Sequence, residues 1–538
     1  MAFYSNDFNI LHIEIKSLKE ENLLLKQQND ELVNLVAMMR EETQQLKDEI
    51  AVLKKQKPRP KIPPSILEGP KSKDKQKNKT SRGKHPRQKK TNKLQIHKKQ
   101  RIRPDYIPEG AAFKGFQKYT VQDVILESRN TLYELERWIL PDGTYVTGQL
   151  PPSVHGHYGT TLLTYILHQC YACRVTEPLL LIQLREMGVL ISEGQLSNLL
   201  TKHKDSFHEE KEGLLEAGIA ATGQIQTDDT GARHSGKNGY ANIIGNEFFT
   251  TITTTDSKSR INFLRLLHGI EARYLVNEDT MSYIETLNPS NWLRGYLNLH
   301  SFEESMEQDA WYVFLRSINI ISEADIRLAT EGALFASLLQ KGFPRDLGVH
   351  GDDAGQFNVF IRSLCWIHEE RHYRKIIPTN DEARLEIEKI RDEIWELYKG
   401  LKKYKEAPCE QSRQSLDKQF EDLFTQKTSS PTLAKQLAKT HAKKDRLLKV
   451  LERPATPLHN NRSETDAREI VTKRKVSGGT RSVLGKRSRD TFLSLKKTCH
   501  KLDVSFWGYL KDRLSGICDI PNLAQIIAIR SAIKPVPS

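Results

Sequence analysis

The chain has 538 residues, with 82 Lys and Arg, 68 Asp and Glu, and a formal net charge of +14. Residues 57–103 hold 18 Lys and Arg against two acids, whereas the rest of the chain holds 64 basic and 66 acidic residues. A near-neutral body with one strongly basic segment indicates contact with a polyanion. The sequence lacks a membrane-spanning apolar run, a secretory signal and a disulfide framework, so we expect a cytoplasmic protein with no membrane partner.

Apolar residues repeat every seven positions through the N-terminal segment. The d positions carry Leu11, Leu18, Leu25, Leu32, Met39, Leu46 and Leu53, and the a positions carry Ile15, Asn22, Asn29, Val36, Thr43 and Ile50. This pattern predicts a coiled-coil dimerisation zipper over residues 1–56. Asn22 and Asn29 favour a parallel homodimer, because a buried amide pairs only with its counterpart. One long helix packed on its own body is the alternative, which the strict period of seven disfavours.

Residues 57–105 are predicted to be a basic, disordered linker. Prolines begin the segment, and Lys71–Lys79 alternates Lys with polar residues and has almost nothing to bury. We expect contact with phosphates that does not depend on base sequence. The candidate DNA-binding residues here are Lys89, Lys90, Lys98, Lys99, Arg101 and Arg103. A solvated tether is the alternative.

Residues 106–218 are predicted to be mostly helical. Apolar spacing indicates helices at Thr160–Tyr171, Thr176–Glu186 and Glu193–Thr201. Ser192 is the candidate N-cap of the last of these. Two helices joined by a glycine turn resemble a helix-turn-helix, whose second helix can enter a major groove. An ordinary helical hairpin is an equally weighted alternative.

From Ile219 the pattern changes to that of strands mixed with helices. Strands or short apolar runs are expected at Gly223–Thr227, Tyr240–Ile244, Glu247–Thr255 and Leu347–Val349. Helices are expected to begin at Ile261 and Met281 and to cover Asn358–Tyr373, His459–Val471 and Asp490–Arg513. The charged segment Glu382–Ala442 has few Gly or Pro and predicts an inserted α-helical hairpin. Strands followed by alternating strands and helices indicate an α/β core.

Three acidic motifs are expected at the ends of strands or at the start of a helix. They are Asp228-Asp229, Asp352-Asp353 and Glu464. Carboxylates at such places can converge on Mg²⁺, which prefers oxygen ligands and takes substrate phosphates as the remaining ones. Two ions about 3.5–4 Å apart would stabilise an in-line displacement at phosphorus. Only one Asp of each pair should reach the site, because adjacent strand residues point to opposite faces. Turn formation and helix capping are the alternative, which spacing alone favours.

The order of these motifs resembles that of the insertion-sequence-66 family of bacterial DDE transposases. The matching segments are Asp228-Asp229-Thr230, Asp352, Cys365-Trp366-Ile367-His368-Glu369-Glu370-Arg371, and Asn460-Asn461 with Glu464 and Arg474-Lys475. The resemblance runs through most of the chain. Four ordered motifs are far more specific than any one of them.

The resemblance implies a multidomain α plus α/β fold. After the coiled coil and a helical DNA-binding region, it implies an RNase H-like mixed-sheet catalytic core over residues 219–375 and 456–538. An α-helical insertion at residues 376–455 would interrupt this core, and C-terminal helices would follow it.

The resemblance also implies a metal-dependent activity. Asp228, Asp352 and Glu464 would be the catalytic residues and the ligands of two Mg²⁺ or Mn²⁺ ions, with Asp229 and Asp353 as register alternatives. The protein would be a homodimeric DNA transposase that cleaves and transfers strands, with element ends and target DNA as partners. It would be nucleoid-associated when bound, and the sequence leaves open whether accessory proteins are required. The alternative is a catalytically inactive, transposase-derived DNA-binding or regulatory protein.

The chain departs from the family pattern at several points. The first motif has Asp229 where the family has Glu, and residues 101–155 contain no Cys, so the zinc module of many members is missing. By type, Cys170, Cys173, Cys365 and His368 would make a Cys₃His zinc set. The first two lie in an apolar helix, where Cys usually packs as a small hydrophobe, so we expect no zinc.

Basic residues around the acids are candidates for DNA contact. His368 and Arg371 are one helical turn apart and could support the site, or could hold a helix to the sheet instead. The segment after Glu464 is basic and contains glycines, which suits DNA lying across the site. The candidates in it are Arg474, Lys475 and Arg481, with a solvated loop as the alternative.

Overall fold

The computed structural model describes residues 95–151, 156–269 and 271–533. The predicted coiled coil, most of the basic linker, and Lys89 and Lys90 lie outside these residues. The chain divides into two units, residues 1–122 and 123–538. In the first unit, residues 95–122 follow an extended course without helices or strands. Within the described ranges, no helix is both long enough and apolar enough to cross a membrane.

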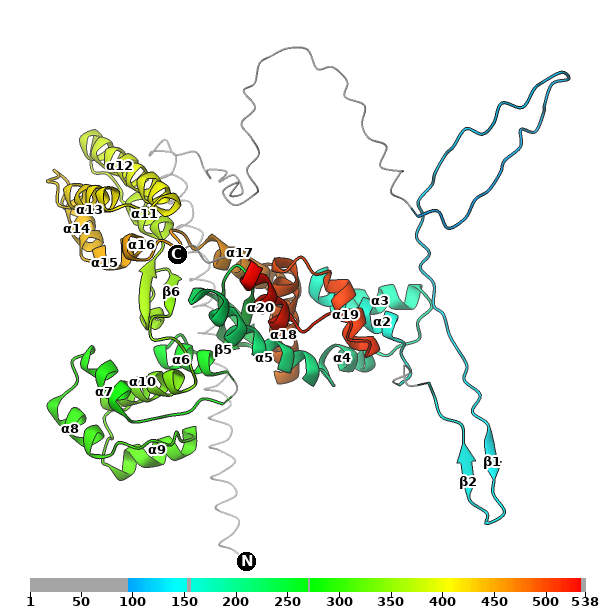
Figure 1. The fold of residues 1–538 in the computed structure, drawn as a ribbon, viewed down its shortest axis with the longest axis horizontal. Helices are drawn as coiled ribbons and strands as arrows, with labels where there is room; N and C mark the ends of the chain where they lie inside the picture. Colours follow the sequence, from blue (N-terminus) through cyan, green and yellow to red (C-terminus); the bar gives the residue numbers. More distant parts are fainter. Residues whose placement is uncertain (1–94, 152–155, 270, 534–538) are drawn as a thin grey trace, which may run out of the picture. The chain divides into compact units, whose positions relative to one another are not determined.

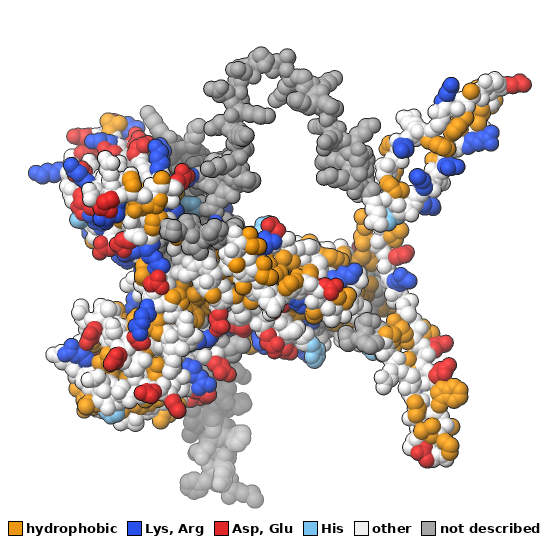
Figure 2. All heavy atoms as spheres, viewed as in Figure 1, with side chains coloured by type: hydrophobic (Ala, Val, Ile, Leu, Met, Phe, Trp, Pro, Cys, Tyr) orange, Lys and Arg blue, Asp and Glu red, His pale blue; other side chains and the backbone are white. Residues whose placement is uncertain are grey.

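Along the described residues, the first regular structure is a small hairpin and not a helix. Strands β1 (Arg137–Ile139) and β2 (Tyr145–Thr147) pair antiparallel, and the side chains of both strands are exposed. Figure 2 shows hydrophobic side chains along this hairpin. Trp138 of β1 is 66% exposed. The mostly helical prediction was therefore wrong for residues 106–151 and 156–159. The turn explains the hairpin, because the Asp142 carboxylate accepts the Thr144 N–H and Gly143 has a positive φ.

The helical region begins at residue 160. Its elements are α2 (Thr160–Leu167), a π-helical turn η3 (His168–Ala172), α3 (Glu177–Glu186), α4 (Glu193–Thr201) and α5 (Asp205–Thr222). The Ser192 prediction is confirmed, since its hydroxyl accepts the Gln195 N–H at the start of α4. Helix α5 was not predicted, and it ends at Gly223 in the left-handed conformation.

A five-stranded mixed sheet follows, with strand order β5-β4-β3-β6-β7. The strands are β3 (Gln224–His234), β4 (Lys237–Gly245), β5 (Thr250–Thr255), β6 (Gly348–Gly351) and β7 (Ile361–Leu364). Strands β3, β4 and β5 are antiparallel neighbours, while β6 pairs parallel with both β3 and β7. The centre of the sheet therefore joins two segments more than a hundred residues apart.

Three sequence predictions are corrected in this region. Strand β3 continues through Asp228 and Asp229 to His234, so this acid pair lies inside a strand rather than at its end. Asn358–Tyr373 is not one helix, because Ile361–Leu364 pairs with β6 before α11 (Trp366–Arg374) begins. Tertiary pairing overrides the helical apolar spacing there. Asp490–Arg513 is also two helices, which separate near Asp503, a residue with positive φ.

The remaining helices lie in three stretches of the chain: between β5 and β6, in the insertion, and in the C-terminal part (Figure 1). Between β5 and β6 lie α6 (Arg260–His268), α7 (Glu278–Glu285), α8 (Asn291–Leu299), α9 (Gln308–Ser317) and α10 (Glu323–Gln340), and η4 (Gly355–Phe357) follows β6. The insertion holds α12 (Asp381–Glu406), α13 (Glu410–Phe424), α14 (Pro431–His441), α15 (Lys444–Leu447) and α16 (Lys449–Glu452). The C-terminal part holds α17 (Asn461–Ser477), α18 (Val483–Lys501), α19 (Phe506–Ser515) and α20 (Leu523–Ile533). The insertion is thus larger than the predicted hairpin, and it shares a hydrophobic core of its own with α11.

Helices cover the two faces of the sheet differently. Helices α17 and α18 pack on the face that carries Ile243 and Ile252, through Ala467, Ile470 and Leu493. We call this face the α17 face. Helix α5 packs on the opposite face, where Phe249 contacts Gly218 of α5. The acids of β3 are distributed between these two faces.

The contact between α5 and the sheet gives a stability prediction. A methyl group at Gly218 would overlap the ring of Phe249, whereas at Gly213, in the same helix, the nearest atom is 4.0 Å away. Gly213→Ala should stabilise the protein by about 0.5–1 kcal/mol through helix propensity. Gly218→Ala should instead destabilise it by about 1–3 kcal/mol through overpacking. Urea unfolding of both variants checks this, and equal effects would contradict the packing.

Candidate active site

The pleat of β3 separates its two adjacent acids. Asp228 pairs in register with Ile243, so its side chain lies on the α17 face, whereas Asp229 pairs with Asn242 and lies on the opposite face. Only Asp228 therefore points toward the helix that carries Glu464.

Asp228 lies in an unfavourable electrostatic environment for a carboxylate. Burial raises its pKa to about 7, and the nearby carboxylates of Asp352 and Glu464 add to this rise. The N–H of Asp229, which donates to Asp228 Oδ1 at 2.8 Å, acts in the opposite direction. The structure thus brings together three acids that were predicted to act together, although they are far apart in the sequence.

Asp229 has its own partners away from these three acids. Lys258 forms an ion pair with its carboxylate, and Gln356 Nε2 donates to Oδ2 at 2.6 Å. The side chain is 7% exposed, so the two contacts satisfy a nearly buried charge. These contacts favour Asp228 over Asp229 as the acid that faces the site.

The second acid pair is divided in a similar way. Asp353 pairs with Lys443 at 2.9 Å and with Arg446 at 3.1 Å, and both cations come from the helical insertion. Lys443 also lies 3.0 Å from the buried carboxylate of Glu369 on α11. Asp352 contributes its carbonyl to the guanidinium of Arg362 and its carboxylate to the N–H of Ala354. Asp353 is therefore held by the insertion, and Asp352 is left to face Asp228 and Glu464.

Glu464 lies in the first turn of α17, and two other acids anchor this helix to its surroundings. Asp466 pairs with Lys497 at 3.0 Å and Lys501 at 2.9 Å. Glu469 pairs with Arg174 at 3.0 Å and Lys496 at 2.9 Å. Asp466 and Glu469 are nearly buried and fully paired, whereas Glu464 points to the candidate site.

Two residues of α11 approach Glu464. Arg371 Nη2 lies 3.3 Å from Oε1, and His368 Nε2 lies 3.5 Å from the same oxygen. Burial and then the charge of Arg371 lower the pKa of His368. The two side chains also contact each other at 3.2 Å. Both predicted support residues therefore lie at the site.

The donors present suit a hard cation. The three acids supply oxygen ligands that repel one another, and Glu464 Oε1 is buried without a hydrogen bond. Within the described ranges, no three His, Cys, Asp or Glu side chains are already arranged as a metal site. A complete protein cage is not required, because Mg²⁺ keeps several waters and takes ligands from substrate phosphates. Cys365, one member of the disfavoured zinc set, instead accepts the backbone N–H of Asn460.

The predicted DNA-binding residues fall into two groups. Lys98, Lys99, Arg101 and Arg103 are exposed in the extended part of the first unit. Arg474 is half-buried and donates to the carbonyl of Gly231 on β3, whereas Lys475 and Arg481 are exposed. Arg474 therefore has a hydrogen-bond partner within the protein, which joins α17 to β3.

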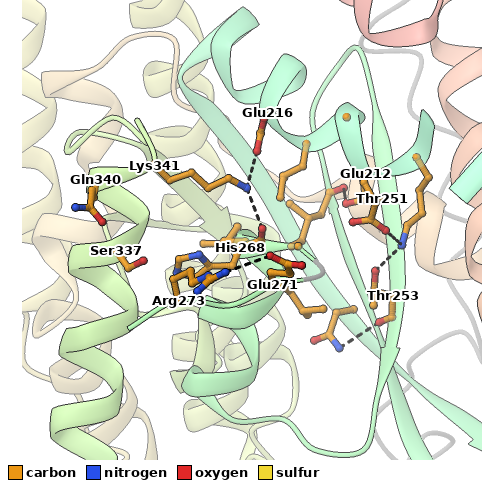
Figure 3. A pocket seen from close by; sticks show the side chains of 18 of the residues that line it. Glu212, Glu216, Thr251, Thr253, His268, Glu271, Arg273, Ser337, Gln340 and Lys341 are labelled. Atoms are coloured by element: carbon orange, nitrogen blue, oxygen red, sulfur yellow. Dashed lines mark hydrogen bonds and ion pairs between the residues drawn. The ribbon is translucent and has the colours of Figure 1, made fainter. Parts of the chain in front are cut away.

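A separate cleft of about 600 Å³ lies on the face of the sheet away from α17 (Figure 3). Helices α5, α6 and α10 and strands β4 and β5 line it, and it contains none of the three acids. Its charged side chains pair with one another or with neighbouring groups, as Lys341 does with Glu216 at 2.6 Å. We therefore do not assign the candidate site to this cleft.

Comparison with known proteins agrees with the motifs. The sequence model described as "Transposase IS66 family" matches residues 354–488, which include the α11 segment, the insertion and Glu464. An uncharacterized protein, y4jO of Sinorhizobium fredii (strain NBRC 101917 / NGR234), is 40% identical over 303 residues. That match covers 56% of this chain and 94% of the relative. The chain belongs to the IS66 transposase family. No solved structure matches it.

Membership in this family implies a DNA-binding, transposase-type protein, as the sequence motifs predicted. The sequence did not identify the cations that hold Asp229 and Asp353. Lys258, Lys443 and Arg446 lie in segments whose pattern is that of ordinary charged surface. Asn460 belonged to a recognised motif, but its contacts could not be derived from that motif.

The raised pKa of Asp228 gives a pH-dependent prediction. Below about pH 4 this carboxyl is protonated in both states, and between about pH 4 and pH 7 the unfolded chain ionises first, so stability falls as pH rises. Asp228→Asn removes this loss. Without divalent ions, its melting temperature should therefore exceed that of wild type more at pH 8 than at pH 5.

Asp229→Asn provides the matched control. Because it breaks the contact with Lys258, it should lower the melting temperature at pH 8. A destabilising effect of Asp228→Asn at pH 8 would show that the three carboxylates do not repel one another as described.

Lys443 and Lys444 are neighbours with different roles, which gives a second test of the site. Lys443→Met should destabilise the protein by about 1–3 kcal/mol, because it removes the cation of the buried Glu369 and one of the two cations of Asp353. Lys444→Met removes only contacts near the surface and should cost less than about 1 kcal/mol. Adding Asp353→Asn to Lys443→Met should recover part of the loss in chemical denaturation. No recovery would contradict the role of the Asp353 contact.

Proposed function

We propose that this protein is a DDE-type DNA transposase that cleaves and transfers DNA strands with two Mg²⁺ or Mn²⁺ ions. The observation that carries the proposal is that Asp228, on the α17 face of the sheet, lies close enough to Asp352 and Glu464 for both charges to raise its pKa. Membership in the transposase family supports DNA as the substrate. Two metal ions held by such carboxylates would stabilise the attacking and leaving oxygens at phosphorus.

The architecture supports an RNase H-like core for this function. Three antiparallel strands are followed by two parallel ones, with the first strand at the centre of the order β5-β4-β3-β6-β7. The acids come from the central strand β3, from the end of its parallel neighbour β6, and from helix α17. This placement is consistent with one metal-binding edge built from two halves of the chain.

The residues of the chain would divide the work as follows. Asp228, Asp352 and Glu464 would hold the metal ions. Arg371 and His368 lie beside Glu464. With the Glu464 carboxylate used as a metal ligand, these two side chains would be available to contact a phosphate of the DNA. The exposed Lys475 and Arg481 would contact the DNA backbone beyond the site. Because the carboxylates would act as metal ligands and not as nucleophiles, we expect no covalent protein–DNA intermediate.

The proposal includes a homodimer held by the coiled coil predicted at residues 1–56. Two protomers would hold two element ends together, with the basic segment at residues 57–103 gripping DNA near the dimer seam. Phosphate contacts of this kind weaken steeply as salt concentration rises.

Cleavage of DNA that carries the repeats flanking the coding sequence tests the function. Asp228→Asn, Asp352→Asn and Glu464→Gln should each lower the Mg²⁺-dependent cleavage rate by at least about a hundredfold. Binding to the same DNA should remain, because these residues hold metal rather than DNA. Strand products on denaturing gels and mobility shifts measure the two properties separately.

Asp229→Asn and Asp353→Asn are the matched controls and should lower cleavage by less than about tenfold. A wild-type protein that binds this DNA but cuts it with neither Mg²⁺ nor Mn²⁺ would instead be a non-catalytic DNA-binding protein. Normal strand joining by Glu464→Gln would show that the assignment of the three acids is wrong.

A further inference from the structure

Asn460, the residue at the start of α17, connects the strand that carries the first acid with the helix that carries the third. The side chain is completely buried, and its Nδ2 donates to the carbonyl of Thr227 at 2.8 Å. Thr227 directly precedes Asp228. The carbonyl of Asn460 itself accepts the N–H of Glu464 at 3.0 Å. A single residue therefore contacts the backbone on both sides of the gap between these two acids.

The backbone N–H of Asn460 extends the connection to the second acid. It donates to Cys365 Sγ at 3.2 Å, and the N–H of Cys365 donates to the carbonyl of Gly351 at 2.9 Å. Gly351 is the last residue of β6 and directly precedes Asp352. Asn460 thus lies within one or two hydrogen bonds of the backbone next to all three acids.

The orientation of the Asn460 side chain is not that of a helix cap. An N-cap Asn usually accepts an N–H from the first turn of its own helix, but Asn460 makes no such bond. Its Oδ1 is buried without a hydrogen-bond partner in the described part of the chain. Leaving an amide oxygen unpaired lowers stability, so the contact with Thr227 determines this orientation at a cost to the fold.

A hydrogen bond between the start of α17 and β3 opposes the repulsion of Asp228 by the other two carboxylates. Asp466 and Glu469 anchor α17 further along, but their ion pairs lie beyond the turn that carries Glu464. Arg371 and His368 contact the Glu464 carboxylate from α11, whereas the Asn460 side chain joins the start of α17 to β3 itself.

We propose that Asn460 is a positioning residue that sets the separation of Asp228 and Glu464 and, through Cys365, of Asp352. The inference rests on the proposed function, in which these acids bind metal. It assigns the Asn a role that neither helix capping nor contact with DNA would give it.

Mn²⁺ binding to the full-length protein, followed by electron paramagnetic resonance, tests the role without any catalytic turnover. Asn460→Ala and the volume-conserving Asn460→Leu should weaken Mn²⁺ binding by at least about tenfold. Asn461→Ala, at the next position, should change it less than about twofold. Cys365→Ala should weaken binding in the same direction and to a smaller extent, and it keeps the test open where Asn460 variants fold poorly.

Hydrogen exchange measured by mass spectrometry gives a readout that does not depend on metal. Peptides covering the first turn of α17 should exchange at least about tenfold faster in Asn460→Leu than in Asn461→Ala, while the rest of the helix is unchanged. Equal exchange in the two variants would overturn the proposal. Wild-type Mn²⁺ affinity in Asn460→Leu would also overturn it, provided that Glu464→Gln abolishes binding.

The two proposals fail in distinguishable ways. Mn²⁺ binding that is unaffected by Asp228→Asn and Glu464→Gln would contradict the metal-binding function of the acids. The exchange measurement would then decide on its own whether Asn460 ties α17 to β3.

Discussion

The repulsion among three carboxylates is the constraint on which the arrangement of this core depends. Asp228, Asp352 and Glu464 come from separate parts of the chain that no local interaction would bring together, and burial raises the pKa of Asp228 to about 7. The cost is offset by contacts elsewhere on the same elements. Asp466 and Glu469 hold α17 through pairs with Lys497, Lys501, Arg174 and Lys496. These ion pairs hold α17 in place and so keep Glu464 near the other two acids, as the proposed metal site requires.

Adjacent acids in the sequence are separated by geometry and by partners. The pleat sends Asp228 and Asp229 to opposite faces of β3, and Lys258 then holds Asp229. Asp352 and Asp353 lie after the end of β6 at Gly351, so a strand pleat does not separate their side chains. Instead, Lys443 and Arg446 of the insertion hold Asp353. The negative charges next to Asp228 and Asp352 are thereby neutralised. The fold can tolerate doubled aspartates because each second member has a cation of its own.

The sequence motifs pointed to the three acids, and the sequence pattern predicted several helices and strands. The pattern did not predict the hydrogen bonds and ion pairs that hold the acids in place. Ser192 was predictable because capping is a local interaction. The ion pairs of Asp229 and Asp353 were not predictable, since Lys443, for example, lies ninety residues from its partner Asp353. The strand at Ile361–Leu364 was missed because its pairing with β6 is nonlocal, and four residues carry too short a pattern. The hairpin around Asp142 was missed although its turn residues were visible. The predicted coiled coil, which has the clearest sequence pattern, lies outside the described residues and stays a prediction.

The helical insertion has a place in this arrangement that its position in the chain explains. It leaves the core after α11, which carries His368 and Arg371, and returns just before Asn460 and α17. Its two ends are joined at the base, where the N–H of Trp366 donates to the carbonyl of Leu458 at 3.0 Å. The indole of Trp366 also donates to the carbonyl of Leu447 at 3.0 Å, inside the insertion. A displacement of the insertion would therefore act on α11, on Asp353 and on the start of α17 together. The insertion thus contributes contacts that hold the residues around the candidate site in place.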